Sequence, residues 1–175
     1  MLLSRLFHVT TLIALLIVTH GQAVAAPPTE ANWWQHMDRY IGEFQMKSPE
    51  FREPILSFQS HWGEPRKLMK YSSKSIGNAP LENMIGFCSW NEETMRLEWQ
   101  EVILSATEGR SAATGFCINA TEKTMTWVVT MFNEDGFVRQ FTMVDTHSDK
   151  GLERSVNLLR GKELERKISR WIKVE

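Results

Sequence analysis

Hydrophobic and polar residues alternate along most of the chain, and the alternation is clearest in residues 84–131, where one pattern occurs twice. Each copy contains the tripeptide Gly-Phe-Cys, then a polar turn, and then an alternating segment with a tryptophan. The tripeptides are residues 86–88 and 115–117, and the tryptophans are Trp99 and Trp127. A period of two is typical of a strand with one buried and one solvated face. Each copy therefore predicts a β-hairpin.

The alternation also predicts which side chains share a face. Three faces are mainly apolar, and their members are Met95, Leu97, Trp99, Glu101 and Ile103 in the first return segment, Met125, Trp127, Val129 and Met131 in the second, and Phe137, Arg139, Phe141, Met143 and Asp145 in residues 137–146. Because apolar side chains are buried on folding, we expect these faces to point into the core.

Further strands are predicted at residues 41–46, 55–62, 67–75, 152–159 and 163–174. About ten short strands with turns at intervals of roughly 8–12 residues are typical of a sandwich or a barrel. The connections in the second half are short, which favours an up-and-down meander that removes its exposed edges by closing. A barrel of about eight or more strands can hold a small ligand.

A short helix is predicted before the first strand. In residues 29–40, Thr29 is the expected N-cap, and Trp33, Trp34, Met37 and Tyr40 recur at helical spacing. The expected fold class is therefore all-β: an up-and-down antiparallel barrel of about ten strands with a short N-terminal helix.

The N-terminal segment has the pattern of an export signal. Arg5 supplies a positive charge, residues 6–18 are apolar, and the Ala23-Val24-Ala25 tripeptide fits a cleavage site. We expect a signal peptide at residues 1–25 and a single domain at residues 26–175, exported to a periplasm or secreted. The apolar run is shorter than the roughly 20 residues that span a bilayer, so we expect no transmembrane anchor.

Charge and motifs exclude several classes of function. The chain has 20 Lys and Arg against 21 Asp and Glu, which gives no basic surface for a nucleic acid. It contains no phosphate-binding, dinucleotide-binding or nucleophile motif. His36, His61 and His147 lack the spacing of metal ligands. We therefore predict no cofactor, no metal site and no catalytic residue.

Two cysteines in an exported protein raise the question of a disulfide. If the two copies are successive hairpins, Cys88 and Cys117 lie on strands separated by a third strand, with their Cα atoms ~10 Å apart. A disulfide needs less than about 7 Å, although a bend or bulge at the strand ends would close that gap. Both a Cys88–Cys117 disulfide and a pair of thiols remain open.

Several short marks along the chain carry a family resemblance. In order, they are Gly42-Glu43-Phe44, Gly86-Phe87, Trp99, Gly115, Arg139, Glu153 and Gly161-Lys162-Glu163. With these marks the chain resembles, from Trp33 to Lys173, a bacterial family of lipocalin-like (calycin) barrels classed as a domain of unknown function. It departs from the family at Phe44, where a tryptophan is usual, at Cys88, which replaces an acidic turn residue, and at Arg170, near an expected aromatic. The resemblance implies a lipocalin-like barrel, and such barrels in general carry small apolar molecules.

The apolar inward faces are the predicted location of a binding site. Arg139 is the informative residue, because an unpaired buried charge is costly. Two interpretations stay open: an internal ion pair with Glu101 or Glu153, or recognition of a ligand carboxylate or phosphate by the guanidinium. The candidate ligand-binding residues, on the inward faces or at the mouth, are Trp62, Tyr71, Trp99, Trp127, Arg139 and Phe141.

Three functional hypotheses follow. The first is a small exported barrel protein that binds a small apolar or amphiphilic molecule in its interior. The second is an interaction or structural module of the cell envelope, with an interior filled by side chains and an exposed aromatic patch around Trp33, Trp34 and Trp171. The third is an enzyme that uses Arg139 with a nearby glutamate. The sequence names neither the ligand nor the oligomeric state.

Overall fold

The computed structural model describes residues 26–47, 53–77, 82–106, 109–160 and 163–174. The predicted signal peptide at residues 1–25 and the Gly161-Lys162 pair lie outside the described residues. The elements are, in chain order, α2 (Trp33–Met37), the 3-10 turn η1 (Asp38–Tyr40), β1 (Gly42–Lys47), β2 (Leu56–Glu64), β3 (Leu68–Ser75), β4 (Glu82–Asn91), β5 (Arg96–Ser105), β6 (Gly109–Ala120), β7 (Thr124–Asn133), β8 (Val138–Ser148), β9 (Gly151–Arg160) and β10 (Glu163–Lys173).

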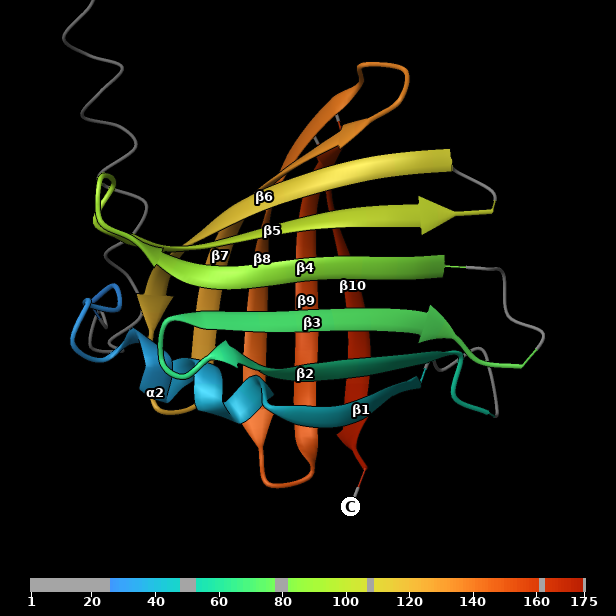
Figure 1. Cartoon of the computed structure of the whole chain (residues 1–175). Helices are drawn as coiled ribbons and strands as arrows, with labels where there is room; N and C mark the ends of the chain where they lie inside the picture. The colour runs from blue at the N-terminus through green and yellow to red at the C-terminus, as the bar shows by residue number, and fades with distance from the viewer. Residues whose placement is uncertain (1–25, 48–52, 78–81, 107–108, 161–162, 175) are drawn as a thin grey trace, which may run out of the picture.

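These strands form one closed antiparallel barrel in which each strand pairs with its neighbour in the sequence. β1 closes the ring by pairing with β10 as well as with β2, and its Phe44 lies opposite Lys173. In Figure 1, β1–β6 run across the front of the view, and β7–β10 run nearly upright behind them. The predicted up-and-down barrel of about ten strands with a short N-terminal helix is confirmed.

The segment formed by α2 and η1 covers one end of the barrel (Figure 1) and buries Trp33, Met37 and Tyr40. The predicted helix starts too early, because the Thr29 carbonyl accepts hydrogen bonds from the backbone N–H groups of both Asn32 and Trp33. This turn precedes the helix, which begins at Trp33. Among the described residues, no helix has the length and apolar character needed to cross a bilayer.

The duplicated pattern corresponds to two successive hairpins, β4–β5 and β6–β7. In each hairpin the cysteine of the tripeptide lies directly opposite the tryptophan of the return strand. Cys88 pairs with Trp99, and Cys117 pairs with Trp127. All four side chains are buried, so the alternation correctly predicts the inward side of both hairpins at these positions. Met95, which was expected on the same face, is exposed instead, because it lies in the turn before β5 with a positive φ.

The glycine of each tripeptide makes room for an aromatic ring. Gly86 lies opposite Tyr71 on β3, and Gly115 lies opposite Trp99 on β5. A Cβ atom on Gly86 would overlap the Tyr71 ring, and one on Gly115 would overlap the Trp99 indole. Both rings therefore lie over a glycine of the neighbouring strand, and their positions depend on the absence of a side chain there.

The first prediction tests this arrangement with Gly115→Ala. The added methyl group forces the Trp99 ring to move, and overpacking of this kind costs about 1–3 kcal/mol. We expect urea unfolding to show that loss and near-ultraviolet circular dichroism to show an altered tryptophan signal. Thr114→Ala, at an exposed position on the same strand, is the control and should leave the tryptophan signal unchanged. A Gly115→Ala protein with unchanged stability and spectrum would show that the ring does not depend on the glycine.

Candidate functional site

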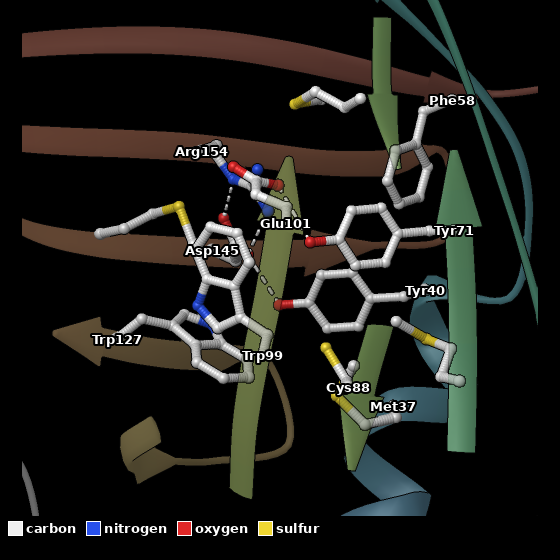
Figure 2. A pocket seen from close by; sticks show the side chains of 13 residues that line it. Met37, Tyr40, Phe58, Tyr71, Cys88, Trp99, Glu101, Trp127, Asp145 and Arg154 are labelled. Atoms are coloured by element: carbon white, nitrogen blue, oxygen red, sulfur yellow. Dashed lines mark hydrogen bonds and ion pairs between the residues drawn. The ribbon is translucent and has the colours of Figure 1, made fainter. Parts of the chain in front are cut away.

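Side chains from the barrel wall and from the covering segment surround a cavity of about 40 Å³. One water molecule needs roughly 10–15 Å³ by this measure. The cavity therefore has room for about three water-sized groups. Figure 2 shows the side chains that line it, which are Met37, Tyr40, Phe58, Met69, Tyr71, Met84, Cys88, Trp99, Glu101, Trp127, Met143, Asp145 and Arg154.

Most of the wall is aromatic or made of methionine. The rings of Trp99 and Trp127 meet edge to face with centroids 6.4 Å apart. The Phe58 and Tyr71 rings lie 5.4 Å apart in a tilted arrangement. Aromatic rings hold their positions, whereas a methionine side chain has three rotatable bonds and adapts to the space available. The cavity thus has rigid aromatic surfaces with adaptable gaps between them.

An ion pair between β8 and β9 forms one side of the cavity. Asp145 and Arg154 lie directly opposite each other in the register. Arg154 donates from Nε to Oδ1 at 2.7 Å and from Nη2 to Oδ2 at 2.9 Å. The Asp145 side chain is fully buried, and that of Arg154 is 25% exposed. The Tyr40 hydroxyl donates to Asp145 Oδ2 at 2.7 Å, so this pair also ties η1 to the barrel.

A second carboxylate approaches the same arginine. Glu101 on β5 accepts a hydrogen bond from the Tyr71 hydroxyl at 2.9 Å. Figure 2 shows its carboxylate beside the guanidinium of Arg154, and its charge favours the protonated arginine. One guanidinium thus lies between two carboxylates in the interior of the barrel.

These neighbours change the acid–base properties of the site. Burial opposes the charge of Arg154, but Asp145 more than compensates, so the pKa of Arg154 lies above its ordinary value. Burial raises the pKa of Tyr40 and of Tyr71 well above the ordinary value, and the carboxylates of Asp145 and Glu101 add to the effect. Both tyrosines therefore stay protonated at neutral pH and act as hydrogen-bond donors.

Both cysteines are buried free thiols. The sequence left open both a Cys88–Cys117 disulfide and a pair of thiols, and the structure has two thiols. Cys88 on β4 lines the cavity, and Cys117 lies on β6, with β5 between the two strands. Burial raises the pKa of Cys88, and it raises the pKa of Cys117 to about 12. Since the thiolate is the nucleophilic form, neither side chain is activated for catalysis.

His147 lies beneath the covering segment, two residues after Asp145. Its ring meets the Tyr40 ring edge to face, with centroids 4.5 Å apart. Its Nε2 atom has no hydrogen-bond partner among the described residues. Burial lowers the pKa of His147 to about 4; Asp145 opposes the shift, and Arg39 adds to it. This histidine is therefore neutral in the folded protein at neutral pH.

Three of the six predicted ligand-binding residues, Tyr71, Trp99 and Trp127, line the cavity. Trp62 does not. Its ring packs against Trp33 with centroids 5.7 Å apart, and its indole N–H donates to Asp38 Oδ1 at 2.9 Å. Trp62 therefore fixes the covering segment to β2 instead of lining the cavity.

The prediction that Arg139 lies in the core is wrong. Arg139 shares the parity of Asp145, but it lies near the start of β8, where its side chain is exposed and its guanidinium is 5.1 Å from the Phe137 ring centroid. Phe141 is half-buried and packs on the core without lining the cavity. Parity identifies the side of the sheet, whereas the position along the strand decides how deep a residue lies. The internal ion pair is formed by Arg154 instead.

The sequence did carry a signal for part of the polar cluster. Asp145 and Glu101 occupy alternating positions on mainly apolar faces, where a buried charged residue is informative. Arg154 carried a similar signal, because it alternates with Leu152, Val156 and Leu158, but the sequence pattern does not distinguish it from Arg139. Only the pairing of β8 with β9 places Arg154 opposite Asp145.

The second prediction concerns the buried ion pair. Asp145→Asn keeps the shape of the side chain but removes the charge that pairs directly with Arg154, which leaves the more distant charge of Glu101 as its counter-charge. Loss of one partner of a buried pair costs about 3–5 kcal/mol, and we expect the lower end because Arg154 is partly exposed. Urea unfolding at pH 7 measures the loss.

Glu153→Gln is the matched control for this substitution. Glu153 accepts a hydrogen bond from Arg170 at 3.0 Å on the neighbouring strand pair, but the two side chains are 41% and 72% exposed. An exposed pair of this kind contributes at most about 1 kcal/mol. Similar losses in the two variants would contradict a special role for the interior pair.

The third prediction is a pH dependence caused by His147. The pKa of this group is 6.5 in the unfolded chain and about 4 in the folded protein. Between these values the unfolded chain binds a proton that the folded protein does not, so stability is present above pH 6.5 and is lost as the pH falls toward 4. The loss from this group amounts to at most roughly 3 kcal/mol.

Urea unfolding at pH 7.5 and pH 4.5 measures this dependence in the unsubstituted protein and in His147→Gln. The variant should lose less stability on acidification, because glutamine does not titrate. His61→Gln, at an exposed position on β2, is the control and should behave like the unsubstituted protein. Equal pH dependence in all three proteins would exclude His147 as the cause.

Comparisons with known proteins assign no family to this geometry. No protein-family model matches the chain, and no curated protein has a similar sequence. Among the described residues, no group of three or more His, Cys, Asp or Glu side chains is placed to hold a metal ion. The cavity with its Asp145–Arg154–Glu101 cluster is therefore the candidate functional site on its own physical properties.

Proposed function

We propose that the protein is an exported barrel that binds a small apolar or amphiphilic molecule in its interior. The observation that carries the proposal is the cavity of about 40 Å³, which has aromatic and methionine walls and a polar cluster on one side. Ligand sites in proteins typically combine an apolar lining with a few placed polar groups. The proposed ligand would lie between the aromatic rings, with its polar group toward Glu101 and Asp145.

The volume limits the size of the ligand. Space for about three water-sized groups suits a molecule of a few heavy atoms, and a long acyl chain does not fit the cavity as it stands. Four methionines line the cavity, and rotation about their side-chain bonds is the available route to a larger volume. These are Met37, Met69, Met84 and Met143.

Access to the cavity involves the covering segment. Met37 of α2 and Tyr40 of η1 belong to the lining, so a ligand that enters from this end has to displace them. The hydrogen bond from Tyr40 to Asp145 holds the segment in place. Entry from this end is therefore coupled to the polar cluster.

A second candidate function, an interaction module of the cell envelope, is favoured by the outer surface. Ile85, Val102, Ala112, Phe132 and Val138 lie opposite one another in a continuous row across β4 to β8. The four larger side chains in this row are 42–69% exposed. Large exposed apolar areas mark interaction sites. The aromatic patch expected for such a module around Trp33, Trp34 and Trp171 is not formed, because Trp33 and Trp171 are buried.

The fourth prediction tests the interior site with 1-propanol as a small amphiphilic probe. If the cavity binds it, nuclear magnetic resonance titration shifts the indole signals of Trp99 and Trp127. Cys88→Leu fills the cavity and should abolish the shifts, whereas Ser72→Leu places the same side chain at an exposed position on β3. Native mass spectrometry of protein purified from its own host shows whether a molecule copurifies.

Two results together would reject interior binding: no shift of the cavity signals with the probe, and no copurified mass. Shifts confined to the outer row would favour the interaction module, since its apolar side chains point away from the cavity.

A further inference from the structure

We propose, on the basis of the interior site proposed above, that the polar group of the ligand is an uncharged oxygen acceptor, such as a carbonyl or ether oxygen, and that it accepts a hydrogen bond from the indole N–H of Trp127. This class of ligand follows from three features of the lining: its unpartnered donors, their position, and the charges beside them.

Two nitrogen atoms of the lining lack hydrogen-bond partners among the described residues. They are the Nε1 atoms of Trp99 and Trp127, the equivalent tryptophans of the two hairpins. The two residues are 7% and 2% exposed. An indole nitrogen donates but cannot accept, and a buried donor without an acceptor is costly. The interior therefore has free donors, and a group that accepts hydrogen bonds would complete it.

The other polar side chains of the lining do not supply this acceptor. Arg154 donates twice to Asp145, and the Tyr40 hydroxyl donates to the same carboxylate. The Tyr71 hydroxyl donates to Glu101. The oxygens of these groups are thus engaged by donors other than the indoles, and none of them accepts from Trp99 or Trp127.

The Trp127 indole lies at the edge of the polar cluster. Burial and Asp145 raise the pKa of Tyr40, and an interaction with the Trp127 side chain opposes them, so the indole lies beside the Tyr40 hydroxyl. In Figure 2 this hydroxyl points toward the two indoles. The contact lacks the geometry of a hydrogen bond, and the hydroxyl proton goes to Asp145. A ligand oxygen at this point would accept from Trp127 while its apolar part contacts the aromatic wall.

Neighbouring groups hold the Trp127 ring before any ligand arrives. The ring meets that of Trp99 edge to face, with centroids 6.4 Å apart. The Trp99 nitrogen in turn lies in the space that a side chain on Gly115 would fill. Because the donor is already fixed, little conformational entropy is lost when an acceptor binds to it.

The charges of the lining favour an uncharged acceptor over an anion. To bind the guanidinium of Arg154, a carboxylate or phosphate would have to displace Asp145, whose side chain is fully buried. A buried charge without its partner is costly. An ammonium ion, by contrast, has no lone pair for an indole N–H. An uncharged oxygen avoids both difficulties.

The experiment compares acetone, 2-methylpropene and acetate, which share one planar frame of four heavy atoms. Nuclear magnetic resonance titration of the protein with ¹⁵N-labelled tryptophan follows each indole N–H. Acetone should shift the Trp127 indole proton downfield, because a hydrogen bond forms there. 2-Methylpropene should enter the same cavity without that downfield shift, and acetate should not bind.

Trp127→Phe removes the donor and keeps an aromatic ring. The ratio of the acetone affinity to the 2-methylpropene affinity should fall roughly three- to tenfold, which corresponds to the net contribution of one hydrogen bond. The ratio corrects for the change in cavity size, because both probes have the same shape. Trp62→Phe is the matched control: the Trp62 N–H donates to Asp38 and the residue does not line the cavity, so the ratio should stay unchanged.

Three results would overturn this assignment while the interior site itself stands: 2-methylpropene binding with no downfield shift of the Trp127 proton by acetone, an unchanged affinity ratio in Trp127→Phe, or acetate binding more tightly than acetone. If Trp127→Phe does not fold, the proton shift in the unsubstituted protein decides alone. If neither acetone nor 2-methylpropene binds, the proposed function fails as well.

Discussion

Closure of the barrel is the constraint on which the rest of this structure depends. Because β1 pairs with both β2 and β10, the sheet has no free edge, and every second side chain must fit into a space of fixed width. Two of the large aromatic rings lie directly over a position of the neighbouring strand that has no side chain. Gly86 and Gly115 are these positions beneath Tyr71 and Trp99, so the same two glycines that permit close packing also shape the cavity.

The ionic cluster is the second consequence of that limited interior. Asp145, Arg154 and Glu101 lie where water has little access, and desolvation of such groups offsets much of their mutual attraction. Replacement of buried ion pairs by apolar residues of similar volume is often neutral for stability in proteins. One structural consequence of the cluster is its link to η1, since the Tyr40 hydroxyl donates to Asp145.

The cavity and the outer row of apolar side chains differ in their chemistry. Inside, rigid aromatic rings and methionine side chains lie beside a cluster of charged groups. Outside, Ile85, Val102, Phe132 and Val138 expose apolar surface. A barrel separates these two surfaces completely, because side chains alternate between inside and outside along every strand. Each surface can therefore change without disturbing the other.

The sequence by itself determined the strands, the hairpins and the inward parity of Trp99 and Trp127, since these follow from local alternation and turn residues. It also identified Glu101 and Asp145 as charged residues on apolar faces. Tertiary structure alone decided that Arg154, and not Arg139, lies inside. Parity repeats every two residues along a strand and contains no information on depth, whereas the register between β8 and β9 sets which arginine faces Asp145. The size of the cavity was likewise undetermined, because it depends on how rings from five separate elements meet across the closed barrel.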